Sequence, residues 1–336
     1  MLRTLGIIIL FFIIFIFFVI ELILQIYKNP NSSNNKSKVT LTYLGYKGDM
    51  GNQLFQLACL YAAAKRSNAD IVLTTESKKL EYNELFDLGN VIYEDIHADK
   101  IYREWDNYEN IVIPNDGKNY DIHGYRQSYH YFEDYDVKKL FKINEDILTK
   151  VKNALPKEFI AIHMRKGDYY KIIHNVSPSF KEFNNCNDYY YIAGIKKIRK
   201  QFPNLPIIVC SNNKEIIDLE KINDTENENM ISFSPKIEGI KDKFIDFCTL
   251  YLSKALIISN SSYSFWAAYL GEHDIVICPS PWWDNNGFLG YHIMDNNNYY
   301  YPTWILLNPK TGKKAEKEPE KEKTLNFFRL IRGFVV

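Results

Sequence analysis

The pattern that most constrains the fold is an alternation, from Phe159 to Cys278, of short apolar segments with longer amphipathic ones. The apolar segments have the length of strands and are expected at 159–164, 206–210, 230–234, 256–259 and 274–278. Segments with helical spacing of apolar residues lie between them, at 188–202, 214–222, 241–255 and 263–271. Apolar strands that are connected by helices form a buried parallel sheet, because each helix crosses back over the sheet. The sequence therefore predicts an α/β fold in this part of the chain.

The preceding part of the chain begins in the same way but soon loses its clear periodicity. The segment 39–44 (VTLTYL) predicts a strand, the segment 52–67 an amphipathic helix, and the segment 69–75 a second strand. The stretch from Glu81 to Lys152 gives no clear assignment. On these grounds we expect an N-terminal domain over 41–152 and a second domain over 153–308.

The two ends of the chain differ from this body. Residues 7–27 are almost entirely apolar and long enough to span a bilayer, and Arg3 precedes them within a short tail, 1–6. A cleaved signal peptide is the alternative, but no A-x-A cleavage pattern follows. We therefore expect a signal anchor of a single-pass type II protein, whose body lies in the lumen of the Golgi or secretory pathway. Residues 28–40 would be a polar stem and 309–336 a charged tail, so the body should fold without residues 1–38.

Composition excludes some classes of function and leaves others open. The 41 basic and 41 acidic residues give a formal net charge of zero, which argues against a nucleic-acid partner. Five cysteines without a C-x-x-C pair support neither a zinc ribbon nor a redox motif. The 25 tyrosines and 21 phenylalanines fit AT-rich coding as well as sugar binding. Sequons at Asn31, Asn35, Asn175, Asn223 and Asn260 predict a glycoprotein if the body is luminal.

Three polar clusters follow predicted strands, where parallel sheets bind their ligands. The first cluster, HMRKGDYY, supplies His163, Arg165, Lys166 and Asp168. A guanidinium grips a diphosphate with two hydrogen bonds and a lysine adds a point charge, whereas an acid can orient the arginine or take a proton. A solvated charge cluster is the alternative. The concentration of these groups directly after a buried strand favours a diphosphate site.

The second cluster is SNSS, at residues 259–262, which leads into a predicted helix. Any of Ser259, Asn260, Ser261 and Ser262 can cap that helix, but four consecutive capping residues exceed what one helix needs. Free N–H groups at a helix N-terminus bind anions, so this cluster predicts phosphate binding. Glycosylation at Asn260 would block such a site.

The third cluster is GYKGDMGNQ, in which Gly45, Gly48 and Gly51 would let the backbone approach a ligand. Its glycine spacing fits neither a dinucleotide-binding loop nor a Walker loop. Asn52 and Gln53 open the next helix and can bind sugar hydroxyls or simply cap the helix.

A short D-x-D pattern, Asp134-Tyr135-Asp136, is of the kind that many glycosyltransferases use to hold a divalent metal. It follows no clear apolar strand, and three residues match easily by chance. Since an arginine and lysine cluster beside a helix N-terminus can neutralise a diphosphate, we expect no metal cofactor.

Four motifs occur in the order found in glycosyltransferase family 11, the α-1,2-fucosyltransferases, which the chain resembles from Thr42 to Trp283. They are GDMGNQLFQLACLYAAAKR, GYRQSYHYF, IAIHMRKGDYY and IISNSSYSFWAAYLG, and PIIVCSNN and IVICPSPWW also fit. The family's H-x-R-R-G-D motif falls on 163–168, with Lys166 where a second arginine often stands. Its N-S-S-F-S-W-W motif becomes NSSYSFW, with aromatic residues exchanged for one another.

The resemblance implies a GT-B-like fold of two Rossmann-like halves, GDP-β-L-fucose as donor, inversion to an α-linkage, and no metal. It assigns catalysis to Arg165, Asp168 and His163, and donor binding to Arg165, Lys166, Ser211, Asn260, Ser261 and Ser262. The acceptor, a galactose-terminated glycan, would contact Gly51, Asn52, Gln53 and Gln127. The motif leaves the general base unassigned.

Two alternatives remain open. One is a fucosyltransferase of another linkage or acceptor, such as a protein O-fucosyltransferase, which shares an H-x-R motif; the GNQLFQ helix favours family 11. The other is a membrane-tethered carbohydrate-binding protein without catalysis, which would keep its aromatic residues but has no need of Arg165. The intact phosphate cluster argues for the enzyme.

Overall fold

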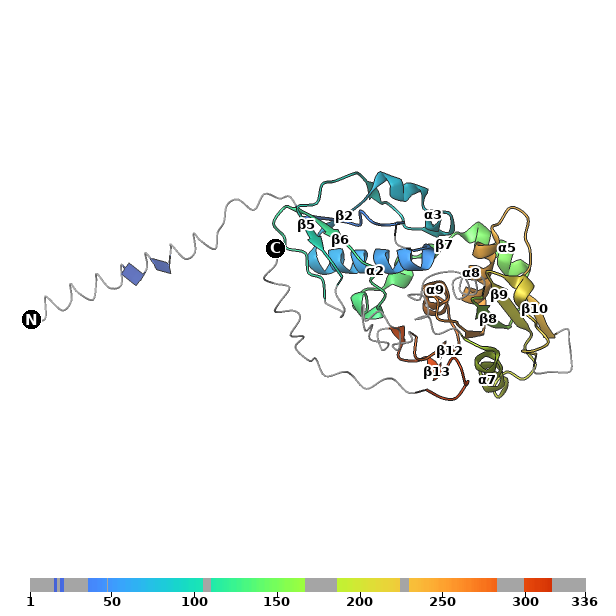
Figure 1. Ribbon diagram of the computed structural model, residues 1–336. Helices are drawn as coiled ribbons and strands as arrows, with labels where there is room; N and C mark the ends of the chain where they lie inside the picture. The colour runs from blue at the N-terminus through green and yellow to red at the C-terminus, as the bar shows by residue number, and fades with distance from the viewer. Residues whose placement is uncertain are drawn as a thin grey trace, which may run out of the picture.

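The computed structural model describes residues 15–16, 19–20, 36–46, 48–104, 110–166, 186–223, 230–282 and 299–315. These residues form two α/β halves, each built on a parallel sheet (Figure 1). The second parallel sheet was predicted, and the α/β class is confirmed. The parallel sheet of the first half was only implied by the family resemblance.

The sheet of the first half has the strand order β4-β2-β1-β6-β5, with every pair parallel. Its strands are β1 (Lys38–Thr40), β2 (Asp70–Leu73), β4 (Ile92–Tyr93), β5 (Lys100–Tyr102) and β6 (Asn119–Ile122). A short antiparallel pair, β3 (Phe86–Asp87) and β7 (Lys142–Ile143), lies apart from it. Because β1 begins at Lys38, the folded body includes the last residues of the segment predicted as stem.

The helix α2 (Met50–Ser67) follows β1 and contributes more buried residues to the core than any other element of the first half. It ends where Asn68 adopts a left-handed conformation, with φ of 53°, and donates its N–H to Ala64 and Lys65. The shorter helical elements are η1 (Thr75–Lys79), α3 (Tyr82–Leu85), η2 (Tyr129–Tyr131), α4 (Val137–Leu140) and α5 (Glu145–Asn153). The α5 helix packs against the second half, so the chain crosses between the halves before residue 153.

The sheet of the second half has the order β10-β9-β8-β11-β12-β13 and is parallel throughout. Its strands are β8 (Ile160–Met164), β9 (Ile207–Ser211), β10 (Ile231–Phe233), β11 (Ala255–Ile257), β12 (Ile275–Pro279) and β13 (Ile305–Leu307). The helices are α7 (Asp188–Arg199), α8 (Asp242–Leu252) and α9 (Ser262–Leu270). One cluster of buried side chains joins α7 to one face of this sheet, and the core shared with the first half covers the other face.

One expectation for this half was wrong, and one strand was not predicted. The helix predicted over 214–222 is a single 3-10 turn, η4 (Lys214–Ile216), because its apolar residues do not share a buried face: Ile222 is buried, but Ile216 is 47% exposed. A short helix depends on packing for its stability, and this one has too little. The strand β13 was not predicted, since only three residues, Ile305 to Leu307, carry its signal.

The two halves share one core where α2 meets α9. The rings of Phe55 and Phe265 lie 4.7 Å apart, and Trp266 lies 5.0 Å from Phe55 and 5.3 Å from Phe132. In Figure 1, α2 runs between the sheet of the first half and α9. This aromatic contact joins the N-terminal parts of α2 and α9 and thereby fixes the two halves relative to each other.

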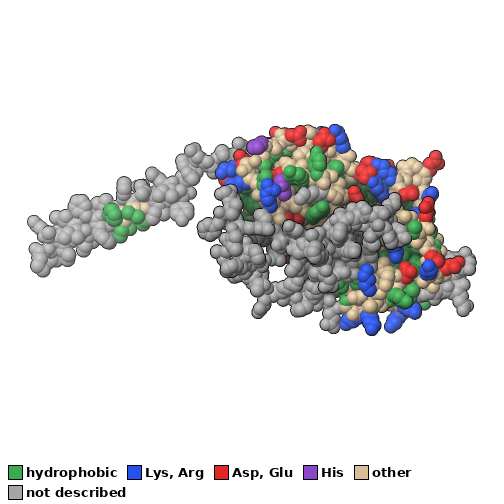
Figure 2. All heavy atoms as spheres, in the orientation of Figure 1, with side chains coloured by type: hydrophobic (Ala, Val, Ile, Leu, Met, Phe, Trp, Pro, Cys, Tyr) green, Lys and Arg blue, Asp and Glu red, His purple; other side chains and the backbone are tan. Residues whose placement is uncertain are grey.

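Charges of both signs are interspersed over the face shown in Figure 2, with basic side chains gathered over α7 at its lower edge. Lys196, Lys197 and Arg199 occupy the last turn of that helix, where positive charge offsets the helix dipole. The described residues contain no helix that is long and apolar enough to cross a membrane. The predicted anchor at 7–27 lies almost wholly outside the described residues.

Candidate active site

The strand β8 carries the first predicted cluster to the carboxyl edge of the second sheet. His163 is part of the strand, 5% exposed, and its Nδ1 lies 2.8 Å from the hydroxyl oxygen of Ser259. The ring of Tyr263 lies 5.5 Å away, centroid to centroid. His163 therefore joins the end of β8 to the segment after β11. Asp168, predicted to act with it, lies outside the described residues.

Arg165 and Lys166 leave the end of β8 in different directions. The Nη1 of Arg165 donates to the hydroxyl of Ser261 at 3.2 Å. The ammonium of Lys166 instead lies 3.4 Å from the carbonyl oxygen of Cys186 and 3.6 Å from the carboxylate of Asp188. Consecutive side chains of an extended segment point to opposite faces. Arg165 is thus directed to the start of α9, and Lys166 to the start of α7.

The N-terminus of α9 has the geometry of an anion site. Ser261 is the N-cap residue, in extended conformation, but its hydroxyl makes no capping hydrogen bond and instead accepts from Arg165. Asn260 is 3% exposed and donates to the carbonyl oxygen of Trp282 at 3.5 Å. The helix dipole and the N–H groups of the first turn therefore lie beside a guanidinium, an arrangement that favours a phosphate.

The neighbouring strand β9 completes this edge. Met164 is paired with Ser211, and the backbone N–H of Lys166 donates to the side-chain oxygen of Asn212 at 3.2 Å. The hydroxyl of Ser211 accepts the N–H of Asn213 at 3.2 Å, which closes a tight turn. The described donor residues thus come together from the ends of β8, β9 and β11, three adjacent strands. Their binding role remains a prediction.

The residues predicted to face the acceptor lie where the halves meet. A Cβ atom on Gly51 would lie 2.4 Å from the backbone nitrogen of Tyr263 and 2.5 Å from the carbonyl carbon of Ser262. The close neighbour that requires glycine there is therefore α9. Asn52 accepts a hydrogen bond from the side chain of Gln127.

Of two further contacts of these residues, one joins the halves and the other is local. The oxygen of Gln127 accepts from the hydroxyl of Tyr299 at 3.4 Å, so the residue is linked to both halves. The amide of Gln53 donates to the carbonyl oxygen of Gly48 at 3.2 Å and secures the turn before α2. Of the residues that the sequence predicted to bind the acceptor, Gly51, Asn52 and Gln127 thus lie at the contact between the halves, next to the start of α9.

Sequence reasoning missed a buried cluster at the carboxyl edge of the first sheet. Asp121, on β6, accepts hydrogen bonds from the N–H and the hydroxyl of Thr42, which follows β1. The Nε2 of His123 lies 2.6 Å from the same carboxylate. The signal was present as two polar residues at the end of β6, in YDIHGY, but that strand was not recognised.

The D-x-D pattern is engaged in local contacts. The carboxylate of Asp134 accepts two hydrogen bonds of 2.8 Å from the guanidinium of Arg66, which hold the pKa of Asp134 below its usual range. Asp136 pairs with Lys139 at 3.1 Å. The described residues contain no group of three or more His, Cys, Asp or Glu side chains arranged to hold a metal ion.

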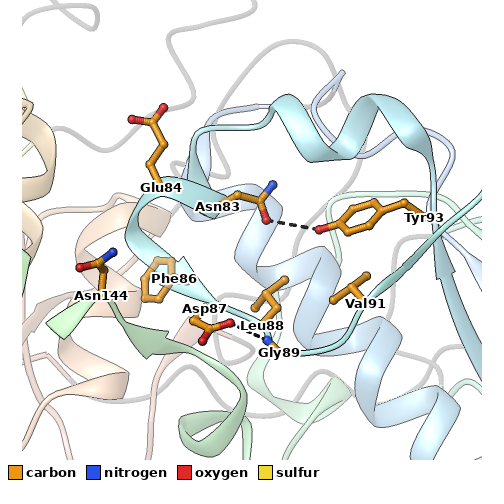
Figure 3. A pocket seen from close by; sticks show the side chains of 9 residues that line it. All are labelled: Asn83, Glu84, Phe86, Asp87, Leu88, Gly89, Val91, Tyr93 and Asn144. Carbon is orange, nitrogen blue, oxygen red and sulfur yellow. Dashed lines mark hydrogen bonds between the residues drawn. The ribbon is translucent and has the colours of Figure 1, made fainter. Parts of the chain in front are cut away.

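A cavity of about 320 Å³ lies elsewhere on the first half and contains none of the predicted site residues (Figure 3). Asn83 and Tyr93 form a hydrogen bond of 3.5 Å on its wall, and the N–H of Gly89 donates to Asp87 at 2.8 Å. Most of its other lining residues come from the segment 84–91, with Asn144 beside them. The candidate active site is therefore set by the edges of the two sheets and is separate from this cavity.

The contact between Arg165 and the start of α9 lies within a segment that matches a known protein family. Residues 18–308 match the family model described as Glycosyl transferase family 11. The chain belongs to glycosyltransferase family 11. This membership confirms the predicted family and the prediction that the protein is a glycosyltransferase enzyme. The matched range includes the candidate site at the ends of β8, β9 and β11 as well as the junction around α2.

Individual relatives of this family 11 protein share a third or less of its residues over the aligned segments. An α-1,2-colitosyltransferase of Escherichia coli is 33% identical over 129 residues, which span 37% of this chain and 41% of the relative. Galactoside α-(1,2)-fucosyltransferase 2 of Mus musculus is 25% identical over 68% of each chain. A solved fucosyltransferase, NodZ from Bradyrhizobium, is 13% identical with a TM-score of 0.43, over 71% of this chain and 94% of that one. The reaction is therefore argued from family membership and from this chain's own residues.

Proposed function

We propose that the protein transfers L-fucose from GDP-β-L-fucose to the 2-hydroxyl of a terminal galactoside, with inversion to an α-linkage. The family match and the galactoside fucosyltransferase among its relatives confirm this predicted class of reaction. The observation that carries the donor assignment is the hydrogen bond between Arg165 and Ser261, because it places a guanidinium at the N-terminus of α9. That combination suits a diphosphate leaving group.

The chemistry follows from where charge develops. In the transition state the bond between the sugar C1 and the β-phosphate oxygen is nearly broken, and negative charge grows on the diphosphate. Arg165 and the first-turn N–H groups of α9 stabilise that charge without having to reorganise. The acceptor hydroxyl attacks the opposite face of C1, which inverts the configuration. Transfer then needs a base that takes the hydroxyl proton.

No metal is required by this scheme, because fixed positive charge replaces it. Asp134 is held by Arg66, so the D-x-D pattern would have to give up that pairing to bind a cation. We expect turnover to persist in excess EDTA, measured as GDP release with and without added Mn²⁺. A loss that Mn²⁺ restores would contradict this expectation and make Asp134 and Asp136 candidate ligands.

The donor sugar has one close competitor. Colitose is L-fucose without its 3-hydroxyl, and the relative from Escherichia coli is named for transferring it. A site built to hydrogen-bond a hydroxyl rejects an analogue that lacks it, whereas an apolar pocket discriminates far less. Comparing kcat/KM for GDP-fucose and GDP-colitose therefore identifies the natural donor between them.

The decisive experiment gives the purified protein a panel of GDP- and UDP-sugars with β-galactosides or with serine and threonine peptides as acceptors. We expect GDP-fucose to be consumed with a galactoside, and NMR to identify an α-1,2 linkage in the product. Transfer to a peptide hydroxyl would instead support a protein O-fucosyltransferase. Carbohydrate binding without turnover of any donor would support the non-catalytic protein.

The placement in the cell belongs to the same proposal. A type II anchor at 7–27, a stem and a luminal body would place the site where glycans mature in the Golgi. Protease protection of the body in sealed microsomes tests this orientation. Digestion of the body by protease added outside intact vesicles would contradict it.

A further inference from the structure

The buried cluster at the edge of the first sheet contains a histidine, His123, whose ring is hydrogen bonded through one nitrogen among the described residues. Asp121 is 2% exposed and anchors the Nε2 of His123 at 2.6 Å. A carboxylate accepts hydrogen bonds, so it fixes the proton of a neutral imidazole on Nε2. The lone pair of the ring then resides on Nδ1.

The other ring nitrogen, Nδ1 of His123, takes no part in this cluster. Among the residues that the structure describes, no group hydrogen bonds to Nδ1 of His123, and the side chain remains 10% exposed. The ring packs edge-on against Tyr43, with centroids 4.4 Å apart. Tyr43 is itself 45% exposed, and Tyr46, 76% exposed, lies 6.3 Å from it. The basic Nδ1 of His123 therefore lies beside the partly exposed rings of Tyr43 and Tyr46, and aromatic rings are surfaces on which sugars stack.

The topology places this histidine on the same side of the molecule as the donor edge. His123 follows β6, and its neighbour strand β1 leads through Tyr43 into α2. The N-terminal turn of α2 touches the N-terminal turn of α9 at Gly51. Both sheets thus present their carboxyl edges toward this contact, with Arg165 on one side and His123 on the other.

We propose that His123 is the general base that takes the proton of the acceptor hydroxyl, and that Asp121 positions it. This inference rests on the proposed function. As the acceptor oxygen forms its bond to C1, its proton passes to Nδ1, and the bond from C1 to the phosphate oxygen breaks with its electron pair leaving on GDP. The imidazolium that results is stabilised by Asp121 and later releases its proton to solvent.

A merely structural pairing predicts different behaviour from a catalytic one. Asp121 also binds Thr42, so the cluster secures the turn after β1 even without the imidazole. Glutamine at position 123 keeps a donor toward Asp121 but has no basic nitrogen. His123→Gln therefore separates the two roles, and His123→Ala adds a space in which free imidazole can act.

The experiment measures transfer from GDP-fucose to a β-galactoside together with GDP binding and thermal melting. We expect His123→Gln and His123→Ala to lower kcat by about 10²- to 10⁴-fold. The acceptor KM, the Kd for GDP and the melting temperature should stay near wild type. Added imidazole should restore part of the turnover of His123→Ala, while Asp121→Asn should lose kcat to a smaller degree with little change in GDP affinity.

The control is His97→Gln, which changes an exposed histidine of the same half and should leave kcat unchanged. A His123→Gln enzyme with turnover within about threefold of wild type would overturn the assignment. So would a loss of GDP affinity and melting temperature in parallel with turnover, or the absence of imidazole rescue in a folded His123→Ala protein. A wild-type protein that transfers nothing from GDP-fucose would instead defeat the proposed function itself.

Discussion

Adjacent residues with the same charge have different surroundings at the end of β8. Arg165 contacts the N-cap residue of α9, whereas Lys166 is directed to a carbonyl and a carboxylate near α7. Side chains of neighbouring residues on an extended segment diverge, so only one of the two can aim at a diphosphate from the end of β8. His163 remains the catalytic histidine that the sequence predicted, and its Nδ1 lies 2.8 Å from the hydroxyl of Ser259; the sequence gave no such role to His123, whose Nε2 lies beside Asp121.

The first prediction tests the guanidinium. Removing one preorganised donor to developing charge costs about 10²–10³ in turnover, so Arg165→Ala should lose at least that much kcat. Arg165→Lys should recover little, because an ammonium cannot form two parallel hydrogen bonds to a diphosphate. Lys166→Ala is the matched control and should be milder. Wild-type turnover in Arg165→Ala, with an unchanged melting curve, would remove this residue from the mechanism.

At the scale of elements, the sequence predicted the strands that consist of long apolar runs. β8 and β9 were predicted because each is a nearly continuous apolar run, and the polar cluster at 163–166 could be placed because it lies at the end of β8. Its role in donor binding stays a prediction. The first sheet was harder, since β4 has only two residues and β6, NYDI, mixes polar with apolar side chains. The Asp121 and His123 pair was missed for the same reason. Contacts between halves, such as Gly51 against α9, depend on tertiary packing and leave no local signal.

The packing of α2 on α9 gives the second prediction. Gly51→Ala adds a methyl group 2.4 Å from the backbone of Tyr263, so α9 must shift. Overpacking of this kind costs about 1–3 kcal/mol, and the shift also displaces the anion site at Ser261. We expect a lower melting temperature together with weaker GDP binding, measured by calorimetry.

Gly89→Ala provides the control for this substitution. Gly89 has a φ of +70° and no atom within 4 Å of the added methyl group, so the variant carries backbone strain without a collision. It should lose about 1–2 kcal/mol of stability and keep its GDP affinity. If Gly51→Ala binds GDP as tightly as Gly89→Ala does, the contact between α2 and α9 does not position the donor site.

The helix α8 provides a third prediction, through its buried Asp246. Burial raises the pKa of Asp246 from 3.8 to about 6, and hydrogen bonding from Ser234 and the charge of Lys214 only partly oppose this. Between these pH values the folded state binds more protons than the unfolded one, so stability falls as pH rises. The slope is about 1.4 kcal/mol per pH unit, or about 3 kcal/mol over the window.

Asp246→Asn should flatten this dependence, because the amide cannot ionise. The measurement is the free energy of unfolding in urea between pH 4 and pH 6, and Asp146→Asn, an exposed change at the start of α5, is the control. A slope that persists unchanged in Asp246→Asn would show that another group titrates there.

At the scale of the whole molecule, one core unites two halves that resemble separate domains in sequence. The cluster that contains Phe55 also contains Phe265 and the buried residues of α8, so the halves are not independent folding units. The helix α5 reinforces this, since it belongs to the first predicted domain but packs on α8. The domain boundary at residue 153 stays a prediction, and the side chains on its two sides share one core. A shared core fixes the two sheet edges relative to each other, which the proposed function requires of its donor and acceptor sites.

The contacts of Ser37 and Lys38 determine where the protein can be shortened. Ser37 is 1% exposed; its hydroxyl donates to the carbonyl oxygen of Pro114 at 2.6 Å and accepts from the N–H groups of Asp116 at 3.0 Å and Gly117 at 3.1 Å. Lys38 then opens β1 in the middle of the first sheet. The sequence placed both residues in the stem, so deletion of 1–38 looked harmless. The structure shows that it removes a buried anchor and the first residue of a central strand.

The last prediction compares two truncations. A protein that begins at Lys36 keeps Ser37 and should be soluble, with the kcat and melting temperature of the full body. One that begins at Val39 loses the hydrogen bonds of the Ser37 hydroxyl, worth about 2–4 kcal/mol together, and its melting temperature should fall by several degrees. Ser37→Ala in the longer protein separates these bonds from the loss of backbone and should account for most of the difference. If both truncations melt and turn over alike, β1 does not need its first residue, and the boundary at the end of the stem lies where the sequence alone had placed it.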